Sequence, residues 1–257
     1  VSIIVGGTRG IGQAVARTLA ARGGNVFVIG RNPERLDATL QDLRASGHGL
    51  HIGRVLDAAV PDDMSEMAAV CAQTYGRADL LVFSAVVAGY EEITRLPPQM
   101  LDLPVVAWRK ALDVNLHGVF LSNRAVLPLM IRQGQGDIIN IGSALTRHGM
   151  RGRAHAVSYS ATKYALAAFT HCLASEVGEH GVRVNAIFPG TVATPLIENT
   201  VLAREFGGQI AAEHLAQILV RLLEFSADSM PLDPFILPMP GNPLGIQDHG
   251  ARSGAGS

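Results

Sequence analysis

A tyrosine and a lysine stand four residues apart in the segment Tyr159-Ser160-Ala161-Thr162-Lys163. On a helix this spacing places both side chains on one face, one turn apart. A nearby ammonium group stabilises a phenolate, so we expect Lys163 to lower the pKa of the Tyr159 phenol from its ordinary value of about 10. Such a phenol is suited to proton transfer. Because this spacing also occurs by chance in many helices, its meaning depends on the surrounding residues.

Two further polar residues fit the same chemistry. Ser143 follows a strand of buried type, at the end where open α/β sheets present ligand-contacting groups, and its hydroxyl could stabilise charge that develops on a carbonyl oxygen. Asn115 lies inside an expected helix, where asparagine is not a favoured residue. Each residue alone also has a structural interpretation: Ser143 as a cap, Asn115 as a helix kink, Tyr159 as packing and Lys163 as a surface charge. Together they predict a site that exchanges a proton with a carbonyl or hydroxyl substrate.

A glycine-rich turn, Gly6-Gly7-Thr8-Arg9-Gly10-Ile11-Gly12, follows the first expected strand and opens a helix. Glycines at 6, 10 and 12 permit a tight turn in which backbone N–H groups and a helix N-terminus face a pyrophosphate. In this context the turn predicts dinucleotide binding. The alternative is a turn that serves only the packing of the helix on the sheet.

Two arginines bear on the choice of dinucleotide. At the end of the second strand, where a carboxylate would bind the ribose hydroxyls of NAD, the chain has Gly30-Arg31-Asn32. Arg31 and Arg9 together suit a phosphate dianion on the ribose, which predicts NADP(H) as the cofactor. The alternative is that both arginines are ordinary solvated surface charges.

Short β-branched runs alternate with longer segments of helical periodicity. This order predicts an α/β protein with a Rossmann-like, doubly wound parallel sheet, helices on both faces and a single domain. The expected strands are Ser2–Val5, Asn25–Ile29, Leu80–Phe83, Asp137–Ile141, Arg183–Phe188 and a short one at Phe235–Leu237. The expected helices are Ile11–Arg22, Pro33–Ala45, Asp62–Thr74, Val105–Arg132, Ser158–Gly178 and Ala211–Phe225.

The composition excludes several classes of function. Hydrophobic residues make up 48% and charged residues 17% of the chain, which suits a sheet covered on both faces, and the net charge of -1 offers no bulk attraction to nucleic acid or anionic membranes. No apolar run reaches the roughly 18 residues of a membrane span, and the first residues resemble a strand rather than a signal peptide, so we expect a cytoplasmic protein. Cys71 and Cys172 lie in no metal-ligand spacing. We expect no metal site, no disulfide, and both cysteines buried.

From Val1 to about Pro195 the chain resembles the short-chain dehydrogenase/reductase family. The resemblance rests on the Gly-x-x-x-Gly-x-Gly spacing and on Asn115, Ser143, Tyr159 and Lys163, which match the family's four catalytic positions in order. It implies an NADP(H)-dependent oxidoreductase that interconverts a ketone and a secondary alcohol, with Tyr159 as proton donor or acceptor and Asn115 on a proton path to Lys163. The cofactor contacts that it implies are Gly6, Thr8, Arg9, Gly10, Ile11, Gly12, Arg31, Asp57, Ala85, Tyr159, Lys163, Pro189, Gly190, Val192 and Thr194.

The resemblance also implies an organisation and an assembly. The domain would cover residues 1–249, with a dinucleotide-binding half at about 1–142 and a catalytic half at about 143–249, followed by a flexible tail at 250–257. A homodimer or homotetramer would form on the two long helices, here Val105–Arg132 and Ser158–Gly178. The expected partner is a small carbonyl or alcohol substrate, with no role for nucleic acid or membrane.

The chain departs from the family pattern at several points. Val5 replaces the usual threonine, and Phe83-Ser84-Ala85-Val86 replaces Asn-Asn-Ala-Gly. A basic insertion between Ser143 and Tyr159 could face an acidic substrate or could be a solvated loop; it contains Arg147, His148, Arg151, Arg153 and His155. Two alternatives to the reductase therefore stay open: a dinucleotide-binding regulator without catalysis, and a sugar-nucleotide epimerase or dehydratase.

Overall fold

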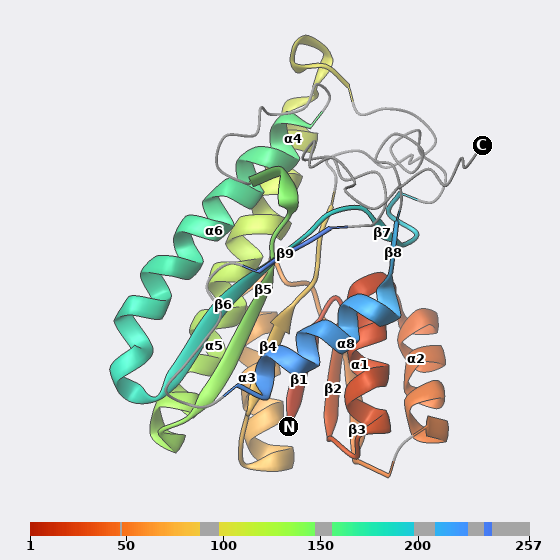
Figure 1. Ribbon diagram of the computed structural model, residues 1–257, viewed down its shortest axis with the longest axis vertical. Coiled ribbons are helices and arrows are strands. Elements are labelled where there is room, and N and C mark those ends of the chain that lie inside the picture. The colour runs from red at the N-terminus through yellow and green to blue at the C-terminus, as the bar shows by residue number, and fades with distance from the viewer. Residues whose placement is uncertain (47, 88–97, 147–155, 198–208, 226–233, 238–257) are drawn as a thin grey trace, which may run out of the picture.

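The fold is a seven-stranded parallel sheet with the strand order β3-β2-β1-β4-β5-β6-β9 (Figure 1). The computed structural model describes residues 1–46, 48–87, 98–146, 156–197, 209–225 and 234–237. The strands are β1 Ser2–Val5, β2 Val26–Gly30, β3 His51–Val55, β4 Leu80–Phe83, β5 Gly136–Ile141, β6 Val182–Pro189 and β9 Phe235–Ile236. The order reverses between β1 and β4, so the predicted doubly wound, Rossmann-like fold is confirmed.

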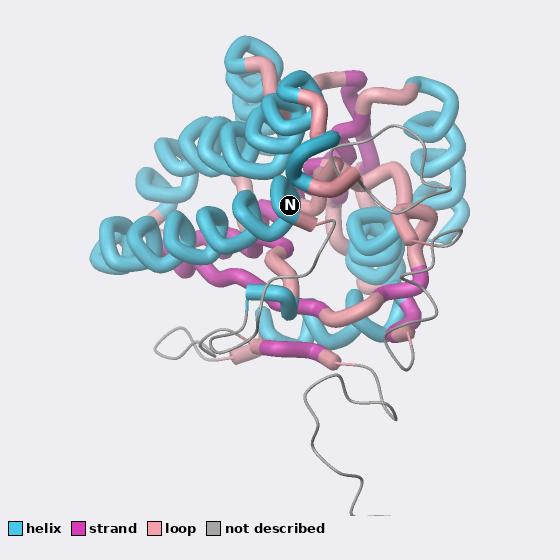
Figure 2. Tube along the Cα trace, turned by 90° about the horizontal axis from the view of Figure 1, so that it is seen from above, coloured by secondary structure: helices cyan, strands magenta, loops and turns pink. Residues whose placement is uncertain are grey.

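Helices cover both faces of this sheet, as Figure 2 shows from above. Successive strand residues point to opposite faces, so Ile3 packs with the helices of one layer and Ile4 with those of the other. The helices α1, α2 and α8 form one layer, and α3, α5 and α6 form the other. Their bounds are α1 Gly10–Ala21, α2 Pro33–Ser46, α3 Pro61–Tyr75, α4 Val105–Leu112, α5 Gly118–Gln133, α6 Val157–Val177 and α8 Ala212–Leu223.

The structure differs from the expected elements at three places. The helix expected over Val105–Arg132 is interrupted by a π-helical turn at Asp113–His117, which separates α4 from α5. Strand β3 was not among the expected ranges because it is an edge strand with little apolar alternation and a central Gly53 that packs closely under Leu36 of α2. A two-stranded sheet of β7 Val192–Ala193 and β8 Ile210–Ala211 was also not expected.

A buried polar network joins three elements behind the carboxyl half of β5. The side-chain amides of Asn123 on α5 and Asn140 on β5 form two hydrogen bonds with each other, one of 3.2 Å and one of 3.3 Å. Asn140 also donates to the Thr170 hydroxyl on α6 at 3.1 Å. All three side chains are fully buried and mutually satisfied, so the network fixes α5 and α6 in register against the strand that leads to Ser143.

Cys71 is buried in the core, as predicted, but the prediction that Cys172 is buried is wrong, since it lies on the outer face of α6. No helix in the described ranges is both long and apolar enough to cross a membrane. The basic insertion at 147–155, the tail at 250–257 and most of the proline-rich segment before it lie outside the described residues.

Candidate active site

The glycine-rich turn packs directly against the end of strand β4. Gly6 has φ +81°, and a Cβ atom there would lie 2.5 Å from the backbone nitrogen of Ala85. A Cβ at Gly12 would lie 2.4 Å from the carbonyl oxygen of Gly6. Only glycine fits these positions, so the N-terminus of α1 comes close beneath the carboxyl ends of β1 and β4.

Above this turn lies a cavity of about 210 Å³ at the point where the strand order reverses. Its lining brings together most of the residues that the sequence predicted as cofactor contacts: Gly6, Thr8, Arg9, Gly10, Ile11, Arg31, Asp57, Ala85 and Thr194. Backbone from the glycine turn forms its floor. A dinucleotide pyrophosphate fits this floor, because the N–H groups of a helix N-terminus face it.

The other predicted contacts do not line this cavity. Gly12 lies in the base of the turn, where it permits the approach of α1 to Gly6. Pro189 ends β6, and the Gly190 nitrogen donates a 2.7 Å hydrogen bond to the Ile236 carbonyl oxygen of β9. Val192 is buried in β7. Tyr159 and Lys163 lie on α6.

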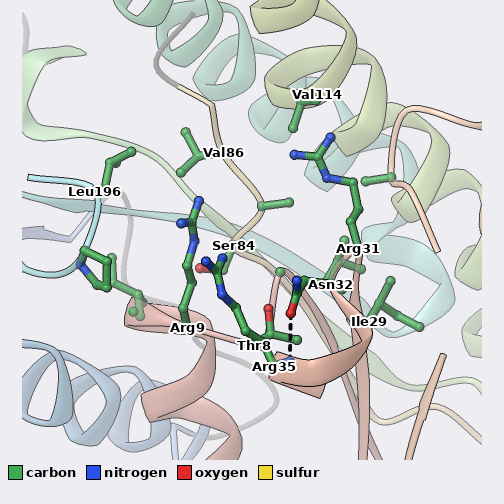
Figure 3. Close-up of a pocket in the computed structure, with 18 of the residues that line it drawn as sticks. Thr8, Arg9, Ile29, Arg31, Asn32, Arg35, Ser84, Val86, Val114 and Leu196 are labelled. Carbon is green, nitrogen blue, oxygen red and sulfur yellow. Dashed lines mark hydrogen bonds between the residues drawn. The ribbon is translucent and has the colours of Figure 1, made fainter. Parts of the chain in front are cut away.

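Three arginines, rather than the two expected, line the cavity: Arg9, Arg31 and Arg35 (Figure 3). Burial lowers the pKa of Arg9, and the positive charges of Arg35 and Arg31 lower it further. Asp57 accepts a 3.3 Å hydrogen bond from Arg31 and is the only carboxylate among the lining residues that the structure describes. The cluster therefore keeps an excess of positive charge, which suits a phosphate dianion.

Arg35 was missed because it follows the strand end by several residues. Its position is set by Asn32, whose side-chain oxygen accepts a 2.7 Å hydrogen bond from the Arg35 backbone nitrogen and so caps α2 (Figure 3). An arginine in the first turn of the helix after β2 is the signal that could have found it.

Asp57 has a structural role in addition to its contact with Arg31. Its Oδ1 accepts a 3.0 Å hydrogen bond from the Ala59 nitrogen, and its own backbone nitrogen donates to Asp63 at 2.6 Å. These bonds form the turn that leads into α3. Ser84 and Val86, at the point where the sequence departs from the family, also line the cavity, and the Ser84 nitrogen continues the sheet by donating to Val5 at 2.8 Å.

Tyr159, Lys163 and Ser143 meet at the carboxyl end of β5. Ser143 is buried directly after the strand, and Tyr159 and Lys163 share one face of α6. The Lys163 ammonium nitrogen lies 5.8 Å from the centre of the Tyr159 ring and donates a 2.6 Å hydrogen bond to the Ile141 carbonyl oxygen. The arrangement expected from the four-residue spacing is thus present.

The pKa values of this group differ from the expectation. Burial raises the pKa of the Tyr159 phenol, and a hydrogen bond with Ser143 offsets part of the rise. Burial also lowers the pKa of Lys163 to about 7. The expectation that Lys163 brings the phenol below its ordinary pKa is therefore wrong in direction, because both charged forms lose hydration and the lysine itself is only partly charged near neutral pH.

Asn115 lies in the π-helical turn and is fully buried. Its side chain exchanges two 2.8 Å hydrogen bonds with the backbone of Val87, just after β4, and donates a third at 3.2 Å to the hydroxyl of Thr162 on α6. Thr162, which the sequence did not single out, donates in turn to the Tyr159 carbonyl oxygen at 2.8 Å. A π-turn often marks a functional site, and here it carries an amide that joins β4 to α6.

A doubly wound sheet with a glycine turn and a cationic cavity at its switch point defines a dinucleotide-binding α/β protein. The family model described as short chain dehydrogenase matches residues 1–205, and the chain belongs to this family of oxidoreductases. It is 36% identical to the D-beta-hydroxybutyrate dehydrogenase of Rhizobium meliloti over 78% of this chain and 74% of that protein. It is 39% identical to the short-chain reductase protein NovJ of Streptomyces niveus over 81% and 74% of the two chains.

A solved structure of a reductase has a similar fold. The structure of actinorhodin polyketide ketoreductase with NADPH superposes with a TM-score of 0.80 at 27% identity, covering 92% of this chain and 95% of that chain.

Proposed function

We propose that the protein is an NADP(H)-dependent oxidoreductase that interconverts a ketone and a secondary alcohol. The observation that carries this proposal is the meeting of Tyr159, Ser143 and Lys163 at the end of β5, in a chain whose dinucleotide cavity holds three arginines. Relatives whose names denote a hydroxybutyrate dehydrogenase and a polyketide ketoreductase support a β-hydroxy or β-oxo substrate.

In this mechanism each residue of the site has a separate task. When bound, NADP(H) supplies or accepts the hydride. The Ser143 hydroxyl binds the substrate oxygen and stabilises its developing negative charge, while the Tyr159 phenol gives that oxygen its proton. A phenol with a raised pKa holds its proton at neutral pH, which suits a proton donor in the direction of reduction.

Lys163 and Asn115 act behind the phenol. Lys163, with a pKa of about 7, can exchange a proton near neutral pH and so return one to the Tyr159 side of the site. Asn115, whose side chain is held by Val87 and Thr162, fixes the π-turn along which a proton relay to Lys163 would run. Both roles are part of the proposal.

The three arginines support NADP(H) over NAD(H). Burial and the positive charges of Arg35 and Arg31 lower the pKa of Arg9, and Asp57, the only carboxylate among the described lining residues, is bound to Arg31. A 2′-phosphate would relieve this repulsion, whereas the ribose hydroxyls of NAD would not. Gly6, Thr8, Gly10, Ile11, Ala85 and Thr194 would contact the rest of the dinucleotide.

The test is oxidation of NADPH in the presence of acetoacetate, acetoacetyl-CoA and a set of cyclic ketones. We expect turnover with at least one β-oxo compound and a loss of at least about 100-fold in Tyr159→Phe, because a positioned acid contributes that much. Tight NADPH binding with no turnover of any carbonyl would instead favour the dinucleotide-binding regulator.

We further propose that the protein self-associates along α4 and α5. One stripe of exposed residues runs along these helices and the π-turn. The intervals between its successive residues form the same series in both chain directions: Val106, Arg109, Asp113, His117, Phe120, Arg124, Pro128 and Ile131. Antiparallel pairing about an axis between His117 and Phe120 would place Val106 opposite Ile131 and Asp113 opposite Arg124 of a second copy. Apolar ends and oppositely charged positions would thus match.

Charge reversal tests this surface. Asp113→Arg and Arg124→Asp should each weaken self-association at least about tenfold in light scattering, since each creates like-charge contacts twice about the axis. The double variant restores opposite charges and should restore the wild-type mass. A monomeric wild-type protein, or single variants with unchanged mass, would exclude this interface.

A further inference from the structure

Thr162 lies between two parts of the site that are far apart in sequence. Its side chain is fully buried in the first turns of α6. The hydroxyl accepts a 3.2 Å hydrogen bond from Asn115 Nδ2 and donates a 2.8 Å hydrogen bond to the Tyr159 carbonyl oxygen. A hydroxyl has one donor and can accept, so this group uses both capacities in fixed directions.

The residue at the other end of this bridge is tied to the dinucleotide cavity. Asn115 exchanges hydrogen bonds with the backbone of Val87, and the chain neighbours Val114 and Val86 both line the cavity. The path from the cavity wall to the backbone of Tyr159 therefore runs through two buried side chains, Asn115 and Thr162. Any shift of the π-turn reaches α6 through the Thr162 hydroxyl.

We propose that Thr162 is a positioning residue that holds the Tyr159 phenol against Ser143, in register with the wall of the dinucleotide cavity. Thr162 touches no reacting atom in this proposal, which rests on the proposed function of Tyr159 and Ser143. Its hydroxyl acts through the backbone of Tyr159 and through the amide of Asn115.

Thr162 must act by hydrogen bonding rather than by filling space. Valine has nearly the shape of threonine but cannot accept from Asn115 or donate to Tyr159. Thr162→Val would leave a buried amide hydrogen of Asn115 without its partner, and serine at this position would keep both bonds. Thr39 provides a matched control: it lies on α2, is equally buried, and its hydroxyl also accepts a hydrogen bond from a side-chain amide, that of Gln13, at 3.1 Å.

The first measurement needs no substrate. In protein labelled with ¹³C at the tyrosine Cζ, the Tyr159 resonance is assigned by its loss in Tyr159→Phe and is read at pH 8. Ser143→Ala defines its position when the phenol has no serine partner. We expect Thr162→Val to move the resonance toward the Ser143→Ala position, Thr162→Ser to return it to the wild-type position, and Thr39→Val to leave it unchanged.

The second measurement separates turnover from binding. With acetoacetyl-CoA or another accepted ketone, Thr162→Val should lower kcat about tenfold, because small misplacement of a catalytic group is costly, while the KM for NADPH stays within about twofold. Thr162→Ser should recover most of kcat. Thr39→Val should change stability without changing kcat.

The two measurements fail differently. If the wild-type protein reduces no carbonyl, the proposed function is wrong, and the resonance of Tyr159 still decides whether Thr162 positions the phenol. An unmoved Tyr159 resonance in Thr162→Val, or an equal shift in Thr39→Val, overturns the proposal. So does a loss of kcat in Thr162→Val that serine fails to rescue.

Discussion

The Lys163 ammonium nitrogen lies 2.6 Å from the Ile141 carbonyl oxygen, at the last residue of β5 and two positions before Ser143. This bond attaches the turn of α6 that carries Tyr159 and Lys163 to the strand that leads to Ser143. It also places a cation where only 3% of the lysine is exposed. Burying this charged group costs free energy, and the cost depends on pH because it disappears when the lysine loses its proton.

Lys163→Met should stabilise the fold, and by more at pH 7 than at pH 9.5. The folded pKa is about 7 and the ordinary value is 10.5, so between these values the unfolded chain binds more protons and wild-type stability rises with pH. Below about pH 7 the penalty is complete, and near pH 10.5 it disappears. In urea unfolding, the difference in free energy of unfolding between variant and wild type should shrink as pH rises from 7, by on the order of 1 kcal/mol per pH unit. A difference independent of pH would contradict the buried, depressed lysine.

The three cavity arginines should contribute unequally to binding of a 2′-phosphate. Arg35→Ala and Arg9→Ala should each weaken binding of adenosine 2′,5′-diphosphate about tenfold or more in calorimetry, because each removes a charged hydrogen bond. Arg31→Ala should cost less, since Asp57 already offsets its charge at 3.3 Å. Adenosine 5′-diphosphate, which lacks the 2′-phosphate, is the control and should bind all variants alike. Equal losses for both ligands would mean that the arginines do not recognise the 2′-phosphate.

Gly6→Ala should destabilise the protein and prevent dinucleotide binding. The added Cβ would meet the Ala85 backbone at 2.5 Å, in addition to the strain of φ +81°. Gly76→Ala is the control, because Gly76 has φ +70° but no atom within 4 Å of its Cβ position. We expect Gly6→Ala to cost about 1–3 kcal/mol more than Gly76→Ala in chemical unfolding. Equal costs would mean that only backbone strain, and not contact with β4, requires glycine in the turn.

The sequence predicted the parts of this fold that depend on local pattern. Strands β1, β4, β5 and β6 are apolar and β-branched, and the helices between them are long and periodic, so their type and order were evident. Edge strand β3 was not predicted because most of its residues are only partly buried or exposed and because it contains Gly53. The π-turn at Asp113–His117 was not predicted because a one-residue change of helical register leaves no periodic signal in the sequence over so short a segment.

For the site, spacing predicted which residues meet but not their energetics. Tyr159 and Lys163 share a face of α6 as their spacing requires, and nine predicted contacts line one cavity. The pKa directions could not be predicted, because they depend on how completely both groups are buried. Arg35 was missed because it lies several residues beyond the end of β2, and Thr162 was missed because its partner Asn115 is distant in sequence.

The last prediction concerns acid stability and a histidine outside the site. His51 begins β3, is 3% exposed, and neither ring nitrogen has a hydrogen-bond partner among the described residues. Burial lowers its pKa, and the positive charge of Arg44 lowers it further.

The folded state of this histidine therefore takes up its proton at lower pH than the unfolded state. The stability that it contributes is fully present above the ordinary pKa of 6.5 and is lost as pH falls through the lower folded value. His51→Leu should remove this loss and, by removing two unsatisfied buried atoms, should stabilise the protein by about 1 kcal/mol at pH 8. The same substitution at the exposed His48 is the control and should do neither. Thermal unfolding at pH 8 and pH 5 measures both effects, and an acid sensitivity that persists in His51→Leu would assign the loss to other groups.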